Sequence, residues 1–233
     1  MRAYKDWKDY ELIDCSDGER LERWGDIVLV RPDPQVIWKT PKEHPLWATP
    51  HAVYNRSSSG GGSWSVYSKM PPVWQIGFED LKFNIKTMGF KHTGLFPEQA
   101  VNWNMTADII RAARRPVKVL NLFAYTGGAT VAALKAGASV THVDASKGMP
   151  LWATEHAAAR GLADAPVRWL VDDCIKFVQR EIRRGNKYDI IIMDPPSYRR
   201  GPGGEVWKRE NEFYGVVELC SELLYEDSLM VLI

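Results

Sequence analysis

The chain has 233 residues, of which 45% are hydrophobic, and this is enough to bury the core of one large domain with a smaller one attached. Its 30 Lys and Arg residues almost balance its 29 Asp and Glu residues, so the formal net charge is +1. This balance excludes a chain-wide attraction to a polyanion, and any nucleic-acid surface must therefore be local.

The cysteines and the N-terminus exclude further classes of protein. Cys15, Cys174 and Cys220 share no C-x-x-C spacing, which argues against a disulfide framework and against a zinc site. The N-terminus is charged, and no apolar run reaches the roughly 18 residues needed to span a bilayer. We therefore expect a cytoplasmic protein with no bound metal and no membrane segment, while the oligomeric state stays open.

The first part of the chain, residues 1–87, is rich in Trp, Pro and Gly. Short apolar runs alternate with turn residues there, and this pattern predicts a small, mostly β domain. The expected strands lie in the runs 26–30, 35–38, 64–67, 74–78 and 81–86. The Ser- and Gly-rich tract 57–63 is either a flexible linker or a hairpin loop, and its position between strand candidates favours the hairpin.

The pattern changes near residue 100, where helical periodicity begins and is followed by alternating strands and helices. Helices are expected at 102–114 and near 128–136, 149–160, 173–184 and 211–224. Strands are expected at 117–123, 139–144, 167–171, 188–193 and 228–233. This alternation predicts an α/β domain over residues 88–233, with a parallel sheet covered by helices on both faces. Because the sequence stops within an apolar strand, we expect further C-terminal strands to be missing from it.

The most informative segment is the strand-to-helix turn 121–128. Glycine at Gly127 and Gly128 allows a close approach of backbone to a ligand, and the helix that follows presents free amides. An ordinary strand-to-helix turn is the alternative interpretation. The spacing is not G-x-G-x-x-G, so the pyrophosphate cradle of a dinucleotide enzyme is missing. A cofactor without phosphates, such as S-adenosylmethionine, fits this turn better.

Acidic residues follow the next two strands. Asp144 ends a strand about twenty residues after the turn, where a carboxylate can accept both hydroxyls of a ribose. Asp172 and Asp173 follow the third strand, where a carboxylate can accept from the amino group of adenine. Helix capping is the alternative role at both places, and Ser146 is the better cap candidate near Asp144. Asp173 is the preferred adenine acceptor, with the Cys174 amide beside it.

The fourth strand ends in Asp194, Pro195 and Pro196. Two prolines fix the backbone and remove two amide donors, so the carbonyls and the carboxylate form a rigid shelf. A double proline alone is only a strand terminator, and its place after the two earlier motifs makes it specific. Tyr198 can stack on a substrate base or seal the pocket.

In this order the motifs resemble those of class I S-adenosylmethionine-dependent methyltransferases with a Rossmann-like fold. The resemblance is closer to the bacterial family that methylates bases of large-subunit (23S) ribosomal RNA. The segments that carry the resemblance are 94–99, 121–128, 144–146, 172–173 and 194–197.

The resemblance implies a role for individual residues. Tyr125 to Gly128 would flank the methionine part of the cofactor, and Asp194 and Pro195 would face the transferred methyl group. The candidate cofactor-binding residues are Phe96, Gln99, Asn121, Phe123, Ala124, Tyr125, Thr126, Gly127, Gly128, Asp144, Ala145, Ser146, Asp172, Asp173, Cys174 and Asp194. The candidate catalytic residues are Asp194, Pro195, Pro196 and Tyr198.

The sequence also departs from that family. Relatives commonly have Asp-Gln-Arg where this chain has Glu98, Gln99 and Ala100, and their N-terminal RNA-binding module is not obvious in this chain. Members that methylate cytosine carbon 5 use a cysteine just beyond the fifth strand, a position that would follow Ile233.

We expect methyl transfer from S-adenosylmethionine to a base of RNA, with ribosomal RNA preferred. The alternatives are a methyltransferase for a small molecule or a protein, and a cofactor-binding module without transfer activity.

Overall fold

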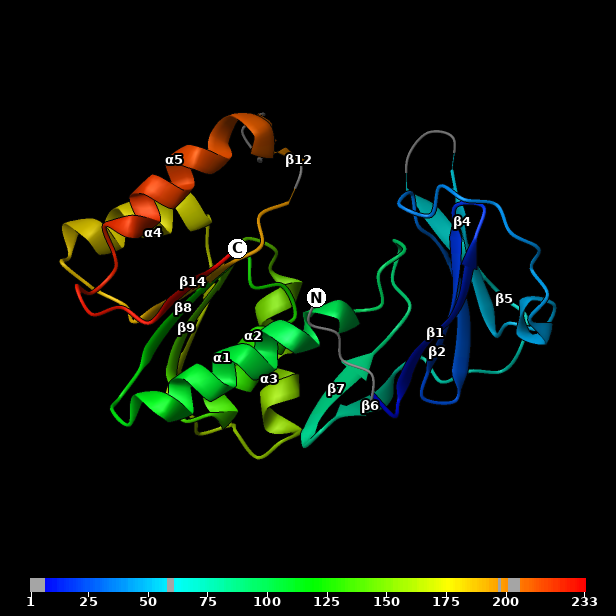
Figure 1. Cartoon of the computed structure of the whole chain (residues 1–233), viewed down its shortest axis with the longest axis horizontal. Helices are drawn as coiled ribbons and strands as arrows, with labels where there is room; N and C mark the ends of the chain where they lie inside the picture. The colour runs from blue at the N-terminus through cyan, green and yellow to red at the C-terminus, as the bar shows by residue number, and fades with distance from the viewer. Residues whose placement is uncertain (1–6, 58–60, 197, 201–205) are drawn as a thin grey trace. The chain divides into compact units, whose positions relative to one another are not determined.

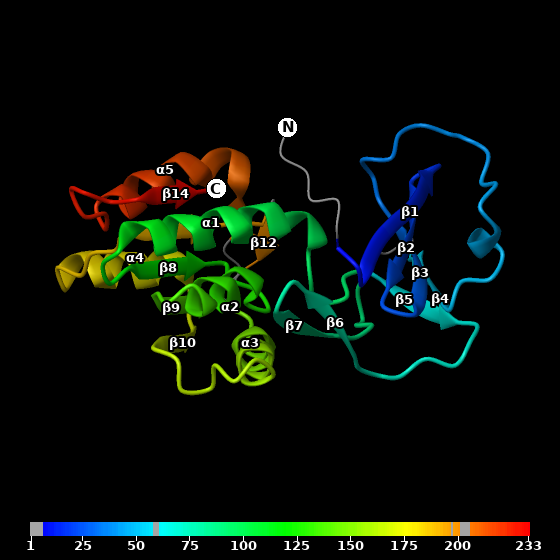
Figure 2. The same ribbon diagram turned by 60° about the horizontal axis from the view of Figure 1, so that its bottom comes forward.

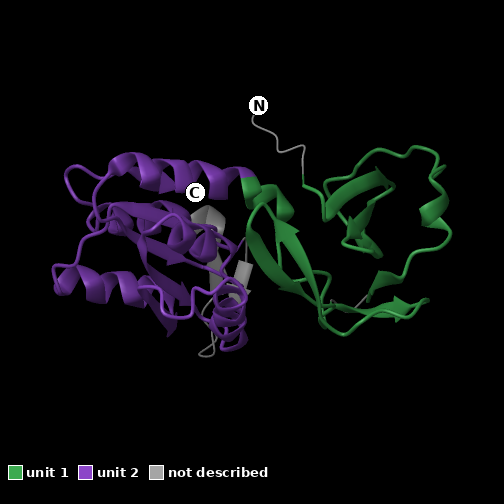
Figure 3. Ribbon diagram, turned by 90° about the horizontal axis from the view of Figure 1, so that it is seen from below, with its two compact units in different colours: residues 1–100 green, residues 101–233 purple. Residues whose placement is uncertain are grey.

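A computed structural model describes residues 7–57, 61–196, 198–200 and 206–233, with the backbone alone for 198–200 and 206–211. The chain divides into two compact units, Met1–Ala100 and Val101–Ile233 (Figure 3). Each unit contains its own sheet and its own buried core. The expected division of the chain after residue 87 stays a prediction.

The first unit is built from strands, as expected. Its larger sheet has the order β1-β2-β3-β4-β5, with β3 and β4 parallel and the other neighbours antiparallel. The strands of this sheet are β1 (Tyr10–Ser16), β2 (Glu19–Trp24), β3 (Ile27–Pro32), β4 (Ala52–Arg56) and β5 (Gly62–Val66). A second antiparallel pair consists of β6 (Trp74–Phe78) and β7 (Leu81–Ile85), and the short helices are η1 (Pro45–Trp47) and η2 (Pro97–Gln99).

The prediction of a strand at 35–38 is wrong. Val36 N–H donates to the Asp33 carbonyl in a turn, and the carbonyls of Val36 and Trp38 accept from the tight turn at Asp17 and Gly18. The hairpin expected around the Ser- and Gly-rich tract is confirmed, because β4 and β5 pair antiparallel on either side of it. Residues 58–60 of that tract lie outside the described residues.

A buried ion pair joins β2 and β3 in the large sheet of the first unit. Arg31 donates through Nε and Nη2 to the two carboxylate oxygens of Glu22, at 2.6 and 2.8 Å, and both side chains are buried. The Tyr10 hydroxyl adds a third hydrogen bond to this carboxylate at 2.8 Å. Burial raises the pKa of Tyr10, and the neighbouring Glu22 carboxylate raises it further. Breaking such a pair leaves a buried charge uncompensated, so these residues constrain one another strongly.

The second unit has the expected parallel sheet, in the order β10-β9-β8-β11-β14. Its strands are β8 (Lys118–Leu122), β9 (Ser139–Asp144), β10 (Val167–Val171), β11 (Ile190–Met193) and β14 (Met230–Leu232). Its helices are α1 (Ala100–Ala113), α2 (Gly128–Lys135), α3 (Gly148–Ala158), α4 (Cys174–Arg183) and α5 (Arg209–Ser221). A hairpin of β12 (Tyr198–Arg200) and β13 (Val206–Lys208) was not expected from the sequence.

Helices cover both faces of this sheet, with α1, α2 and α3 on one side and α4 and α5 on the other (Figures 1 and 2). Strand alternation divides the core accordingly. Leu120 and Leu122 of β8 pack in the cluster with α4 and α5, whereas Val119 packs in the cluster with α1 and α2. These apolar layers fix the register of the strands, because a shift of one residue would exchange the two faces.

Gly127 and Gly128 are required by helix packing. Gly127 has a left-handed φ of 79°, and a Cβ there would lie 2.7 Å from the Cβ of Ala153 in α3. A Cβ on Gly128 would lie 2.7 Å from Cζ2 of Trp103 in α1. The two glycines therefore let α1 and α3 approach the start of α2.

We expect Gly128→Ala to lower the free energy of unfolding by about 1–3 kcal/mol, because the added methyl group overpacks a buried Trp103. Gly148→Ala is the matched control, since a Cβ there meets nothing within 4 Å. Denaturant unfolding of both variants measures the difference. Equal stability of the two variants would contradict the packing role.

Candidate functional site

The carboxyl ends of four neighbouring strands bring the predicted motifs to one edge of the sheet. Leu122 of β8 pairs with Val143 of β9 and with Met193 of β11. The residue after each of them, namely Phe123, Asp144 and Asp194, therefore stands at the same edge. Asp144 in turn pairs with Val171 of β10, and Asp172 follows. Ligands of open α/β sheets bind at this edge.

The turn after β8 has an unusual backbone. Phe123, Tyr125 and Gly127 have φ of 54°, 50° and 79°, so left-handed residues alternate with ordinary ones. For residues with a Cβ this conformation costs of order 1–3 kcal/mol each, and it persists only where the surroundings impose it. Ala124, between the first two, is buried, while Phe123 and Tyr125 are partly exposed.

Four consecutive residues of the turn are each held by a hydrogen bond from a different group. Phe123 N–H donates to Sγ of Cys174 in α4 at 3.3 Å, and Ala124 N–H donates to the Val143 carbonyl of β9 at 3.1 Å. Tyr125 N–H donates to Oδ2 of Asp144 at 2.9 Å. The Thr126 carbonyl lies 2.9 Å from Nδ1 of His156 in α3. The surrounding elements thus impose the strained path.

Asp144 joins the turn to the start of α3. Its second oxygen, Oδ1, accepts from Ser146 N–H at 2.8 Å. The expectation that Ser146 caps the next helix is wrong, because Lys147 occupies the N-cap of α3. A carboxylate oxygen has lone pairs for more than one hydrogen bond, so Asp144 can still accept from the hydroxyls of a ribose. Asp144 and Ala145 are partly exposed at the edge.

The starts of α2 and α4 differ in how their amides are satisfied. Gly127 occupies the N-cap position of α2 but has no side chain to accept from the first amides of the helix, so this end is uncapped and suits the carboxylate of a methionine moiety. By contrast, Asp173 caps α4, with Oδ1 accepting from Ile175 and Lys176 N–H at 3.1 Å each. The neighbouring Asp172 forms an ion pair with Arg180.

Cys174 is buried, and its thiol contacts the backbone of neighbouring elements. Its Sγ accepts from Phe123 N–H and lies 3.7 Å from the Val143 carbonyl, to which it donates. A thiol in this position holds α4 against β8 and β9. Its predicted contact with a cofactor stays a prediction, as do those of Asp172 and Asp173.

Asn121 belongs to a buried polar chain behind the turn. Its Nδ2 donates to Oγ1 of Thr130 in α2 at 2.9 Å, and the same Oγ1 lies 3.0 Å from Nδ1 of His142 in β9. All three side chains are buried. These hydrogen bonds fix the first turn of α2 against two strands. Burial lowers the pKa of His142 to about 3.

The remaining predicted residues divide between the two units. Asp194 is exposed at the sheet edge, Pro195 is buried and Pro196 is half-buried. Tyr198 lies in β12, where the backbone alone is described. Phe96 and Gln99 flank and end η2 in the first unit, so their predicted position over the cofactor stays a prediction.

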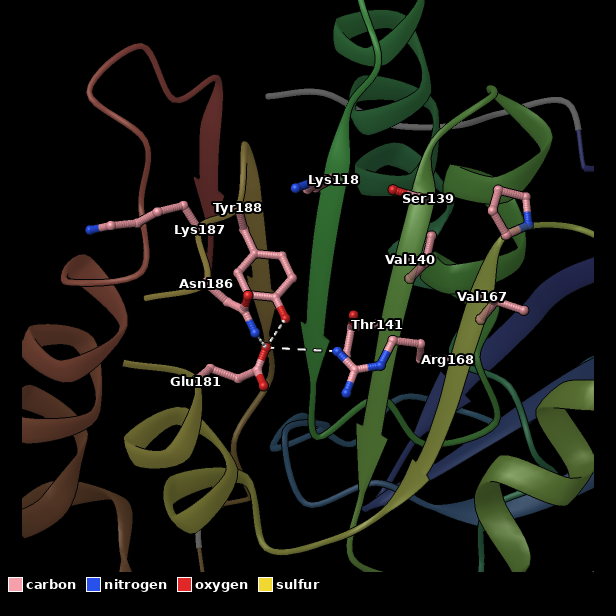
Figure 4. Close-up of a pocket in the computed structure, with 11 residues that line it drawn as sticks. Lys118, Ser139, Val140, Thr141, Val167, Arg168, Glu181, Asn186, Lys187 and Tyr188 are labelled. Atoms are coloured by element: carbon pink, nitrogen blue, oxygen red, sulfur yellow. Dashed lines mark hydrogen bonds and ion pairs between the residues drawn. The ribbon is translucent and has the colours of Figure 1, made fainter. Parts of the chain in front are cut away.

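A cavity of about 420 Å³ opens at the opposite edge of the same sheet (Figure 4). Lys118, Ser139 and Val167 line it, and these residues begin β8, β9 and β10. The buried carboxylate of Glu181 points into this region and accepts from the Tyr188 hydroxyl at 2.7 Å and from Asn186 at 2.9 Å. The cavity is therefore separate from the edge where the motifs gather.

Sequence reasoning missed three residues of the site, namely Thr130, His142 and His156. Each lies on a regular element and contacts the turn or the helix start only through the fold. A buried histidine inside an apolar strand, as in 138–143, is the one signal that could have raised attention.

Among the described residues no group of three or more His, Cys, Asp or Glu side chains could hold a metal ion. None of the helices within the described residues combines the length and the hydrophobicity of a membrane-spanning helix.

Residues 50–224 match the family of S-adenosylmethionine-dependent methyltransferases, and the chain belongs to this family. The family confirms the expected enzyme class and the expected cofactor, S-adenosylmethionine. The residues at the sheet edge fit that cofactor, because an uncapped helix start and a carboxylate at the next strand end match its charged and hydroxyl groups.

Two solved structures share the fold. A SAM-dependent methyltransferase from Agrobacterium tumefaciens is 39% identical, with a TM-score of 0.92 over 98% of this chain and 73% of that one. A methyltransferase from Streptococcus mutans is 22% identical, with a TM-score of 0.73 over 96% of this chain and 60% of that one. The expected Rossmann-like fold is thereby confirmed.

A curated relative agrees with the resemblance found in the motifs. The ribosomal RNA large subunit methyltransferase K/L of Shewanella frigidimarina is 36% identical over 118 residues. These residues make up 50% of this chain but 16% of the relative, so the match spans a small part of that longer protein.

The buried His142 predicts a loss of stability in acid. Its folded pKa of about 3 lies below the ordinary value of 6.5, so the unfolded chain binds the proton more tightly. The part of the free energy of unfolding that depends on a neutral His142 is fully present above pH 6.5 and is lost as the pH falls toward 3. The loss amounts to about 2 kcal/mol between pH 7 and pH 5.

Hydrogen exchange of the β9 amides at both pH values measures this loss. His142→Gln should reduce the pH dependence, whereas His44→Gln, at an exposed position, should keep it. An unchanged pH dependence in His142→Gln would contradict the assignment.

Proposed function

We propose that this chain transfers a methyl group from S-adenosylmethionine to a base of RNA, with large-subunit ribosomal RNA as the substrate. The observation that carries the proposal is the arrangement of Asp144, the strained turn and Asp194 at one sheet edge. The name of the Shewanella relative, which shares the matched region, supports ribosomal RNA as the acceptor. We also propose that residues 1–87 form a separate domain and that residues 88–233 carry the cofactor site.

The proposed cofactor site uses the edge in three places. The amides at the start of α2 receive the carboxylate of the methionine part, and Asp144 accepts from the ribose hydroxyls. Asp173 or the Cys174 amide is proposed for the adenine, in addition to the role of Asp173 as the cap of α4. Phe96 and Gln99 are proposed to cover the cofactor, as the resemblance implies. The bound cofactor supplies the methyl group, and the residues of the chain supply position.

The acceptor side is proposed to begin at Asp194. Its carboxylate and the Pro195 carbonyl can accept hydrogen bonds from an amino group of the base and aim its lone pair at the methyl carbon. Orientation of this kind contributes much of the rate in a transfer between two bound groups. Arg199, Arg200 and Lys208 follow this shelf in the sequence, and these residue types suit a phosphate backbone.

Asp194→Ala should lower methyl transfer roughly 100-fold or more, because it removes an oriented acceptor at the reacting group. Affinity for S-adenosylhomocysteine should change by less than about tenfold, since other groups hold most of the cofactor. The assay follows labelled methyl from S-adenosylmethionine into unmodified large-subunit ribosomal RNA, with the exposed Asp164→Ala as the control.

The same assay distinguishes the alternatives. Label in protein or in a small molecule, with none in RNA, would replace RNA as the acceptor. Cofactor binding without transfer to any of these acceptors would indicate a binding module. Full activity in Asp194→Ala would overturn the role assigned to the shelf.

A further inference from the structure

His156 is a buried histidine that the proposed reaction does not use. It lies in α3, a helix that contributes none of the motifs recognised in the sequence, and its side chain is fully buried. Its Nδ1 lies 2.9 Å from the Thr126 carbonyl. A carbonyl oxygen only accepts hydrogen bonds, so Nδ1 must carry the proton. The contact therefore fixes the tautomer of the ring.

Thr126 stands between Tyr125 and Gly127, both of which have left-handed φ. The Gly127 N–H that follows it donates to the Ala124 carbonyl at 3.0 Å. The three preceding residues are held through their N–H groups, whereas the carbonyl of Thr126 is held by His156. Rotation of the peptide between Thr126 and Gly127 would move the first amides of α2. The hydrogen bond from His156 opposes this rotation at the carbonyl of the peptide, and the one from Gly127 to Ala124 opposes it at the N–H.

We propose that His156 is a positioning residue that holds the turn in the conformation that binds the methionine part of S-adenosylmethionine. This inference rests on the proposed placement of the cofactor at the start of α2. His156 acts through the Thr126 carbonyl and sets cofactor affinity. The acceptor side at Asp194 is unaffected by it.

Two variants separate this role from simple packing. His156→Leu has a similar volume but no donor, whereas His156→Asn places an amide nitrogen where Nδ1 lies and keeps the hydrogen bond. Calorimetry should show an affinity for S-adenosylhomocysteine about 3- to 10-fold weaker in His156→Leu, and within about twofold of the original in His156→Asn. Glu155→Gln, at an exposed position on the same helix, is the control.

Packing and positioning differ in their readouts. A purely structural loss would lower the melting temperature and the number of binding-competent molecules, while the remaining molecules would keep the original Kd. We expect a changed Kd at an unchanged binding stoichiometry, and a raised KM for S-adenosylmethionine with no change in KM for RNA.

Three results would overturn the proposal. The first is a Kd for S-adenosylhomocysteine in His156→Leu equal to that of the unaltered chain. The second is a loss of affinity in His156→Asn as large as that in His156→Leu. Either of these, with the unaltered chain binding normally, leaves the proposed function standing. The third is an unaltered chain that binds no S-adenosylhomocysteine, which removes the proposed cofactor site and the role of His156 together.

Discussion

The site depends on a backbone that alternates between left-handed and ordinary conformations at Phe123, Tyr125 and Gly127. Such a path is unfavourable in isolation, and the fold supplies the hydrogen bonds that impose it. Those bonds come from α3, from α4 and from β9, whose last residue, Asp144, contributes its carboxylate. Because the same residues present the start of α2, the strain and the proposed binding surface have a common origin.

Packing around the turn explains why its composition is so restricted. The sequence indicated that Gly127 and Gly128 allow a ligand to approach, yet the space that their side chains would fill belongs to Ala153 and Trp103. Close packing of α1 and α3 against α2 is therefore the immediate constraint on both glycines. Asp144 has a similar double role, since its oxygens hold two backbone amides at the place where a ribose is expected.

The sequence predicted most of the second unit because strands β8 to β11 read as apolar runs, each followed by a polar motif. It missed β1 and β2, where the buried Glu22 pairs with Arg31 of β3 and hides the alternation of apolar and polar residues. It also gave no sign of His156, whose relation to Thr126 spans thirty residues and exists only in the folded chain. Local patterns report strands and turns, whereas such contacts need the register and the helix positions.

We propose that the strained turn at the carboxyl edge of the sheet is the cofactor site. Hydrogen exchange of the chain with and without S-adenosylhomocysteine tests this directly. We expect increased protection of the amides of residues 123–130 and 144–146. Protection at the opposite edge, around Lys118 and Arg168, or no change in residues 123–130, would contradict it.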